Sequence, residues 1–172
     1  MVATDWPQDV FDALKAAAVR QVAYVPDGGH AALIQAAHDD PEMRAIPLTT
    51  EEEGIPLLAG AQLAGQRGVL LMQSSGVGNC INMLSLVKTC RFPFLTIVTM
   101  RGEFAEQNPW QVPMGSATEA ALRLMDVQVL RAGTPDEAGT VAGAACRMAF
   151  TAGLAVAVLL SQRLVGAKSF VQ

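Results

Sequence analysis

The sequence predicts an α/β protein with three layers, in which a six-stranded parallel sheet lies between two layers of helices (α/β/α). Short apolar segments alternate with segments of helical periodicity along the whole chain. Uninterrupted apolar segments of this length are typical of strands that are buried on both faces of a parallel sheet. Parallel strands that alternate with helices need right-handed crossovers, which place helices on both faces. No repeat or low-complexity linker divides the chain, so we expect one domain over residues 1–172.

Six segments rich in β-branched and other apolar residues are the expected strands. In chain order they are residues 21–26, 44–48, 68–73, 94–100, 127–131 and 154–160. Turn residues bound them: Pro26-Asp27-Gly28 closes the first strand, and Arg101-Gly102 follows the fourth. The strand 68–73 has an apolar run of the length that is typical of a strand buried on both faces of the sheet.

Helical segments separate the strands. In chain order they are residues 5–20, residues 30–38, a segment that starts near Thr49, and residues 79–89, 116–125 and 135–151. The first is amphipathic because Val10 and Leu14 recur on one side, and Asp5 can cap its start. The last helix starts after Thr134 with Pro135 at its first position. Proline is favourable there because the amide at this position has no acceptor within the helix in any case.

The composition excludes several classes of protein. A formal net charge of −4, with 12 basic residues dispersed along the chain, argues against a nucleic-acid surface. Cys80, Cys90 and Cys146 form no Cys-x-x-Cys pair, which is typical of thiols that stay reduced. No leader is evident and no apolar run approaches the about 20 residues of a membrane helix, so we expect a cytoplasmic protein. Only 16% of the residues are charged, which predicts apolar surface buried against another subunit.

Polar side chains gather at both ends of the expected strand 68–73. Before this strand, residues 51–53 are three consecutive glutamates at the start of a helix. After it, the run SSGVGN at 74–79 is expected to form a loop whose glycines let a ligand approach the backbone. Glycines before a helix also serve tight turns alone, and this run lacks the third spaced glycine of a dinucleotide site. We therefore expect no nucleotide site here.

Glu52 is the carboxylate of special interest among the three. Acidic residues in a first helical turn complement the helix dipole, and Thr50 with Glu53 fits a capping box, so the charges by themselves need no catalytic role. Glu52 is in register with Ile55 and Ala59. It is therefore expected to face the packed side, where a carboxylate needs a partner.

Further candidates follow other strands, at the edge of the sheet where ligands bind. Gly28 and His30 follow the first strand, and His30 suits a surface or capping role, or else proton transfer or anion binding. Arg101 follows the fourth strand, where it either ends the strand or clamps an anionic substrate. Trp110, in the long loop after Arg101, is interpreted as an interface anchor rather than a stacking platform.

The run Glu52-Glu53-Gly54 and the run at 74–79 together resemble the pyrimidine-binding domain of thiamine-diphosphate enzymes. The resemblance is strongest to the alpha subunits of sulfopyruvate decarboxylases and to the matching half of phosphonopyruvate decarboxylases. In that family a helix that begins Glu-x-Gly carries the glutamate that activates the cofactor, by a hydrogen bond to its aminopyrimidine ring. The resemblance implies that Glu52 is this glutamate. It also implies further cofactor contacts, which are Ser74, Ser75, Gly76, Gly78 and Asn79.

The resemblance also implies a partner. The family binds the diphosphate and Mg²⁺ through a Gly-Asp-Gly motif with a downstream Asn, and this sequence has no such motif. A diphosphate-binding beta subunit is therefore expected to hold the Mg²⁺, with no metal ligand on this chain. The implied reaction is decarboxylation of a small 2-oxoacid with a sulfonate or phosphonate tail, which Gly28, His30 or Arg101 would contact. A carboligase, a decarboxylase of another 2-oxoacid and a non-catalytic structural subunit are the alternatives.

Overall fold

The computed structural model describes residues 5–167 and confirms the predicted fold class. All six strands are parallel, and they lie in the order β2-β1-β3-β4-β6-β5. Their bounds are β1 (Val19–Tyr24), β2 (Arg44–Pro47), β3 (Arg67–Gln73), β4 (Phe94–Thr99), β5 (Gln128–Ala132) and β6 (Ala155–Leu160). Every predicted strand is present, with ends displaced by at most two residues from those expected.

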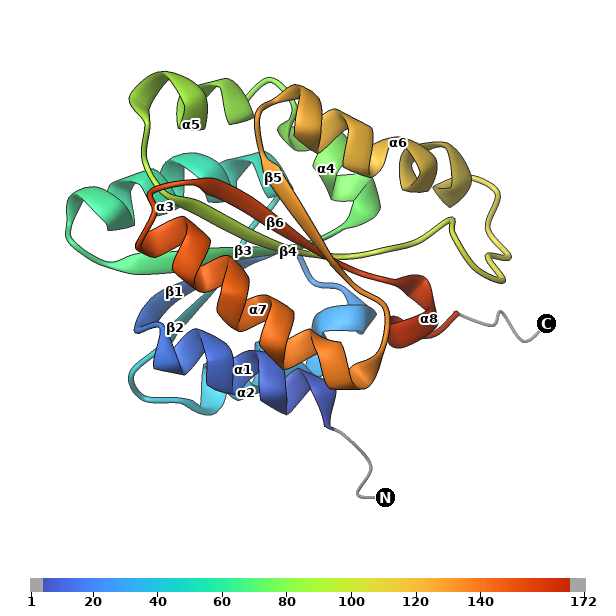
Figure 1. Ribbon diagram of the computed structural model, residues 1–172, viewed down its shortest axis with the longest axis horizontal. Helices are drawn as coiled ribbons and strands as arrows, with labels where there is room; N and C mark the ends of the chain where they lie inside the picture. The colour runs from blue at the N-terminus through green and yellow to red at the C-terminus, as the bar shows by residue number, and fades with distance from the viewer. Residues whose placement is uncertain (1–4, 168–172) are drawn as a thin grey trace.

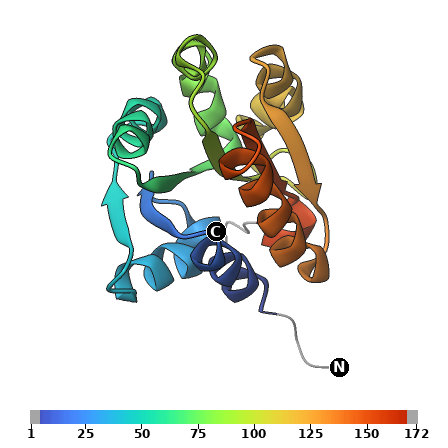
Figure 2. The ribbon, with the colours of Figure 1, turned by 60° about the vertical axis from the view of Figure 1, so that its left-hand side comes forward.

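Helices cover both faces of the sheet, as Figures 1 and 2 show. On one face lie α1 (Trp6–Ala16), α2 (Ala31–Asp39) and α7 (Pro135–Phe150). On the other face lie α3 (Gly54–Leu63), α4 (Ser74–Cys80), α5 (Leu84–Cys90) and α6 (Gln111–Leu124). Three shorter segments complete the description: the 3₁₀ turns η1 (Gly28–His30) and η2 (Glu51–Glu53), and α8 (Gln162–Val165). None of the helices within residues 5–167 is long and apolar enough to cross a membrane.

The sheet separates two apolar cores. Alternate residues of β3 point to opposite faces, so that Val69 and Leu71 belong to the core under α1 and α7. Leu70 and Met72 belong to the core under α3, α4 and α6. All four side chains are fully buried. Burial of one such side chain stabilises the fold by about 1.5–3 kcal/mol, which explains why uninterrupted apolar segments become central strands.

Three helices differ from the expectation. Helix α1 ends at Ala16, and β1 begins at Val19, where the helix was expected to continue to residue 20. Helix α4 begins directly after β3 at Ser74, where a loop was predicted, and it ends before a turn that separates it from α5. Glycine in a helix costs about 1 kcal/mol relative to alanine, which is why the sequence predicted a loop. Glycine is needed at position 76 in spite of this cost, because a Cβ atom there would overlap the carboxylate of Glu51. Similarly, α6 begins at Gln111 rather than near 116, with Pro113 in its first turn.

The strand order reverses between β1 and β3. The chain passes from β1 outward to β2 and then returns to β3 on the other side of β1. In open α/β sheets, ligands bind at the carboxyl ends of the strands beside such a reversal. The loop after β1, the turn η2 and the start of α4 all lie at this edge.

Candidate functional site

The buried carboxylate at this edge is Glu51. Its side chain is only 9% exposed, whereas Glu52 is half-buried. The prediction that Glu52 turns toward the packed side is therefore wrong. Glu51 precedes Ile55 by four residues and Leu58 by seven, and both of these are buried, so Glu51 is the glutamate that shares their face. This spacing was readable in the sequence and is the signal that would have found Glu51.

Glu53 has the capping role that the sequence predicted, although at a different amide. Its Oε2 accepts a hydrogen bond of 2.9 Å from the backbone amide of Thr49. The side chain of Thr50 makes no capping hydrogen bond. Glu53 is exposed and is sufficiently explained by this cap.

The carboxylate of Glu51 is held against α4. Asn79 donates a hydrogen bond of 2.8 Å from Nδ2 to Oε2 of Glu51. Gly76 lies against the same carboxylate, so that its missing side chain makes the room that Glu51 occupies. Within residues 5–167 no group donates a hydrogen bond to Oε1 of Glu51. Oε2 is therefore held by Asn79, whereas Oε1 lies against Gly76 and accepts no hydrogen bond from a described group.

The carboxylate of Glu51 affects the pKa of the nearby thiol of Cys80. Burial raises the pKa of the Cys80 thiol to about 12, and the nearby carboxylates of Glu51 and Glu52 add to this rise. The thiol is therefore protonated at neutral pH and takes no part as a nucleophile. Its Sγ lies 3.8 Å from Sδ of Met72, inside the apolar core.

A chain of hydrogen bonds joins the loop after β1 to the ends of β3 and β4. Thr99 at the end of β4 donates 2.6 Å to Oδ2 of Asp27, and Gln73 at the end of β3 donates 3.0 Å to Oδ1 of Asp27. Ser75 in turn donates 3.0 Å to Oε1 of Gln73. The predicted cofactor contact Ser75 is thus connected to Asp27, which sequence reasoning missed as a site residue. The signal was its place directly after a strand at the reversal of strand order.

His30 lies inside the protein rather than on its surface. It is fully buried, and its Nε2 lies 3.2 Å from the carbonyl oxygen of Met72 and 3.1 Å from that of Ile97. Two carbonyl acceptors require the proton on Nε2. Burial lowers the pKa of His30, although Asp27 opposes this, so the ring is neutral at physiological pH. His30 therefore joins the ends of β3 and β4, and its neighbour Gly28 is exposed.

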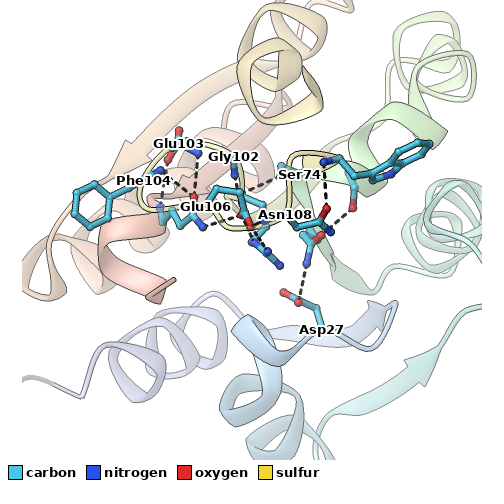
Figure 3. A network of polar contacts seen from close by, with 12 residues as sticks. Asp27, Ser74, Gly102, Glu103, Phe104, Glu106 and Asn108 are labelled. Carbon is cyan, nitrogen blue, oxygen red and sulfur yellow. Dashed lines mark hydrogen bonds and ion pairs between the residues drawn. The ribbon is translucent and has the colours of Figure 1, made fainter. Parts of the chain in front are cut away.

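Arg101 forms a buried ion pair within the chain. Its Nε and Nη2 donate to the carboxylate of Glu106 at 2.6 and 2.5 Å, and the two side chains are 6% and 4% exposed. Gln162 donates a further hydrogen bond of 2.9 Å to Glu106 (Figure 3). The guanidinium holds the pKa of Glu106 far below its ordinary value. The charge of Arg101 is therefore balanced before any substrate binds.

The remaining predicted contacts divide between the surface and the interior. Ser74 is fully buried, and its hydroxyl accepts a hydrogen bond of 3.1 Å from the amide of Arg101. This contact joins the start of α4 to the residue that follows the end of β4 (Figure 3). Gly78 and Asn79 are exposed on α4. The structure thus brings Gly76 and Asn79 together with Glu51, whereas Ser74, His30 and Arg101 serve internal contacts.

The site has no grouping of metal ligands of its own. Among the residues that the structure describes, no three His, Cys, Asp or Glu side chains lie together so that they could hold a metal ion. The polar groups at this edge include the carboxylates of Glu51 and Asp27, the amide of Asn79 and the hydroxyl of Ser75.

Comparison with known proteins identifies the domain. Residues 6–122 match the family model described as thiamine pyrophosphate enzyme, N-terminal TPP binding domain. The chain is 37% identical over 152 residues to sulfopyruvate decarboxylase subunit alpha of Methanococcus maripaludis, covering 88% of this chain and 91% of the relative. The corresponding protein of Methanocaldococcus jannaschii is 38% identical, with 75% and 77% covered.

Two more distant similarities add to this. Phosphonopyruvate decarboxylase of Streptomyces viridochromogenes is 38% identical over 142 residues, which cover 81% of this chain but only 36% of that relative. A 2-oxoglutarate:ferredoxin oxidoreductase structure from Magnetococcus marinus superposes with a TM-score of 0.75 at 14% identity, covering 93% of this chain and 29% of the other, and supports the fold alone. The family model covers well over half of the sequence. The chain therefore belongs to the thiamine pyrophosphate enzymes, as a member of their N-terminal TPP-binding domain family.

Proposed function

We propose that this chain is the pyrimidine-binding alpha subunit of a thiamine-diphosphate-dependent 2-oxoacid decarboxylase. Its substrate is sulfopyruvate or phosphonopyruvate, and the products are CO₂ and the aldehyde. Relatives that match along nearly their whole length are named for the first of these substrates, and a partial match is named for the second. Residues 1–172 would act as one domain, because a single sheet takes its strands from Val19 to Leu160.

The observation that carries the proposal is the position of Glu51. The family resemblance requires a glutamate that hydrogen-bonds the aminopyrimidine ring, and a carboxylate suits this task if one oxygen remains open at a buried edge. Glu51 suits this task because it is buried at this edge, its Oε2 accepts from Asn79, and its Oε1 accepts no hydrogen bond from a described group. We therefore assign to Glu51 the role that the sequence alone suggested for Glu52. Thiamine diphosphate, when bound, supplies the nucleophilic carbon and the electron sink of the decarboxylation.

The chain's own groups would control one proton. With its Nδ2 hydrogen bonded to Oε2, Asn79 disfavours a proton on that oxygen, so a protonated Glu51 carries its hydrogen on Oε1. A proton at Oε1 can be donated to a ring nitrogen placed beside it. Gly76 permits this arrangement because any side chain there would displace the carboxylate. Glu51 would thus act as an acid and base toward the cofactor, and Asn79 would orient it.

A partner subunit completes the proposed enzyme. The relatives are named as subunit alpha, which implies a second subunit in those proteins. We infer that a diphosphate-binding beta subunit holds Mg²⁺ and the diphosphate, since residues 5–167 present no grouped metal ligands. We also infer self-association and a cytoplasmic location from the low charge fraction and the unpaired cysteine pattern of the sequence.

A second candidate substrate class is favoured by one observation. Arg101 was expected to clamp the sulfonate or phosphonate tail, but its guanidinium is paired with Glu106 inside the protein. A decarboxylase of a 2-oxoacid without a second anion is compatible with this pairing. The two candidates are separated by comparing turnover of sulfopyruvate and phosphonopyruvate with that of pyruvate.

The proposed function is tested by reconstitution. The chain is purified alone and together with the product of a neighbouring reading frame that carries Gly-Asp-Gly and a downstream Asn. The pair is expected to bind thiamine diphosphate in a magnesium-dependent manner and to release CO₂, whereas the chain alone binds the cofactor weakly. Tight magnesium-dependent binding to the chain alone would refute the division between two subunits. Cofactor binding by the pair without decarboxylation of any 2-oxoacid would refute the reaction.

A further inference from the structure

A hollow lies between the ends of α1 and α7, at the edge of the sheet where β3 begins. Its volume is about 470 Å³. Ala17 and Thr151, the residues at which α1 and α7 end, both line it, and the two helices lie side by side (Figure 1). Arg67, the first residue of β3, and Arg147, in the last turn of α7, give it positive charge. No acidic side chain is among the described residues that line this two-arginine hollow.

Arg67 is held in place by both helices. Its Nη1 donates a hydrogen bond of 2.8 Å to the carbonyl oxygen of Ala17, and its Cζ lies 5.4 Å from the centre of the Phe150 ring. Within residues 5–167 it donates no other hydrogen bond, and no carboxylate forms an ion pair with it. The guanidinium is therefore oriented by the protein, while most of its N–H groups remain without an acceptor in this part of the chain.

Arg147 reaches the same hollow from α7. Its Nη1 lies 3.6 Å from the position that a Cβ atom of Gly143 would occupy, so the side chain extends back along the helix over this glycine. The side chain is exposed and forms no ion pair within residues 5–167. Burial raises the pKa of the Cys146 thiol to about 11, and the charges of Arg147 and Arg67 oppose this rise. Both guanidiniums therefore lie near one side chain of the wall.

The charge of the hollow is positive even when the helix ends are counted. The carbonyl groups at the end of a helix act together as about half a negative charge, so α1 and α7 offset about one of the two guanidinium charges. The described side chains that line the hollow offset none of the remainder. A guanidinium presents its N–H groups as a planar fork that matches the oxygen atoms of a phosphate group. The small side chains of the wall, such as Ala16 and Gly143, leave room for carbon atoms beside that group.

We propose that the two-arginine hollow binds a small phosphorylated organic molecule, with its phosphate group between Arg67 and Arg147. The tetrahedral phosphate has enough oxygen atoms to accept hydrogen bonds from both guanidiniums, and its two negative charges match their two positive charges. The hollow is separate from the edge that holds Glu51. Arg67 begins β3 and Gln73 ends it, and a strand of seven residues extends for about 20 Å. This second ligand site therefore does not depend on the proposed function.

The test titrates the purified full chain with inorganic phosphate, glycerol 3-phosphate and acetate at constant ionic strength, and follows the backbone amide signals by NMR. We expect saturable shifts at Ala17 and Gly143 with both phosphates and weaker binding of acetate. Arg147→Gln should weaken phosphate binding at least about 10-fold, because one charge-assisted contact is lost. Arg163→Gln is the matched control, since Arg163 is exposed on α8 at the opposite edge of the sheet and its Cζ lies 4.3 Å from the centre of the Phe104 ring. It removes the same charge and should change the dissociation constant by less than about twofold.

Several results would overturn the site. They are the absence of saturable binding, unchanged binding by Arg147→Gln, and equal losses in Arg147→Gln and Arg163→Gln, which would indicate a general attraction of anions. Acetate that binds as tightly as phosphate would overturn the ligand class. A partner protein that binds through Arg147 in place of phosphate would assign the arginines to an interface and also overturn the site. Arg67→Gln is a second variant, whose fold is verified by circular dichroism because Arg67 also contacts Ala17 and Phe150. The titration needs no cofactor, so its result is independent of decarboxylation.

Discussion

Asn79 and Glu51 are 28 residues apart in sequence, yet the Nδ2 of the first lies 2.8 Å from the Oε2 of the second. This hydrogen bond joins η2, which follows β2, to α4, which follows β3. Because it engages only one carboxylate oxygen, it orients Glu51 without closing the site. Our proposal of Glu51 as the functional glutamate thus rests on a contact between two segments rather than on the local motif.

Replacement of Glu51 by Gln is expected to reduce turnover of the reconstituted enzyme by at least about 100-fold, because an amide cannot exchange the proton. The fold and the assembly should be kept, since the amide has the same shape. Glu52→Gln and Glu53→Gln are the matched controls and should retain most of the turnover. Steady-state kinetics of the three variants checks this. A large loss in Glu52→Gln with an active Glu51→Gln would restore the assignment suggested by the sequence.

Gly76→Ala is expected to abolish turnover because it displaces the side chain of Glu51 without removing it. The added Cβ atom would overlap the carboxylate of Glu51 and push it out of its place. Gly60 on α3 is the control, since a Cβ atom there meets nothing within 4 Å. Gly60→Ala should leave activity unchanged and stabilise the helix by about 0.5–1 kcal/mol. Cofactor affinity and thermal unfolding of both variants distinguish these outcomes, and an active Gly76→Ala enzyme would contradict the proposed geometry.

Asn79→Ala removes the donor that orients Glu51. We expect turnover to fall by about 10-fold or more and cofactor affinity to weaken, because a misplaced acid or base loses much of its effect. Asn82→Ala serves as the control, since Asn82 is an exposed residue of the turn that follows α4. Calorimetric cofactor titrations of the assembled enzyme provide a readout that is independent of turnover. Similar behaviour of the two variants would show that Asn79 is not needed for orientation.

The Arg101–Glu106 pair predicts sensitivity to acid. The guanidinium lowers the pKa of Glu106 in the folded state below its ordinary value of 4.5. The folded state therefore binds this proton more weakly than the unfolded state, and the contribution of the pair to stability is complete above pH 4.5 and is lost as the pH falls below it. Denaturant unfolding between neutral and acidic pH measures this loss.

Breaking the pair identifies its role. Arg101→Met would leave the carboxylate of Glu106 buried without its partner, which costs about 3–5 kcal/mol. The guanidinium that lowers the pKa of Glu106 is absent from this variant. We therefore expect its free energy of unfolding to be lower at neutral pH and to change much less as the pH falls below 4.5. If Arg101 is structural, Arg101→Lys affects the Michaelis constants of pyruvate and of a sulfonate substrate equally. A selective rise for the sulfonate substrate would instead support the clamp that the sequence suggested.

The sequence by itself determined the layers of the fold and the family. Strands such as β3 and β4 are buried on both faces, so their apolar character is continuous and readable in a short segment. The start of α7 was also predictable from neighbouring residues. Pro135 follows Thr134, and Glu137 accepts a hydrogen bond of 3.2 Å from the amide of Thr134. Such features depend on residues that are neighbours in the chain.

Only the tertiary structure decided which polar residues are buried and which groups they contact. Glu51 rather than Glu52 is buried because Gly76 and Asn79 approach from another element. His30 is withdrawn from the surface by carbonyl groups of two strands, and Arg101 by a carboxylate five residues away in a loop without periodicity. The physical reason is that a polar side chain buried in a protein needs a specific partner, and the partner is chosen by the folded arrangement of the chain.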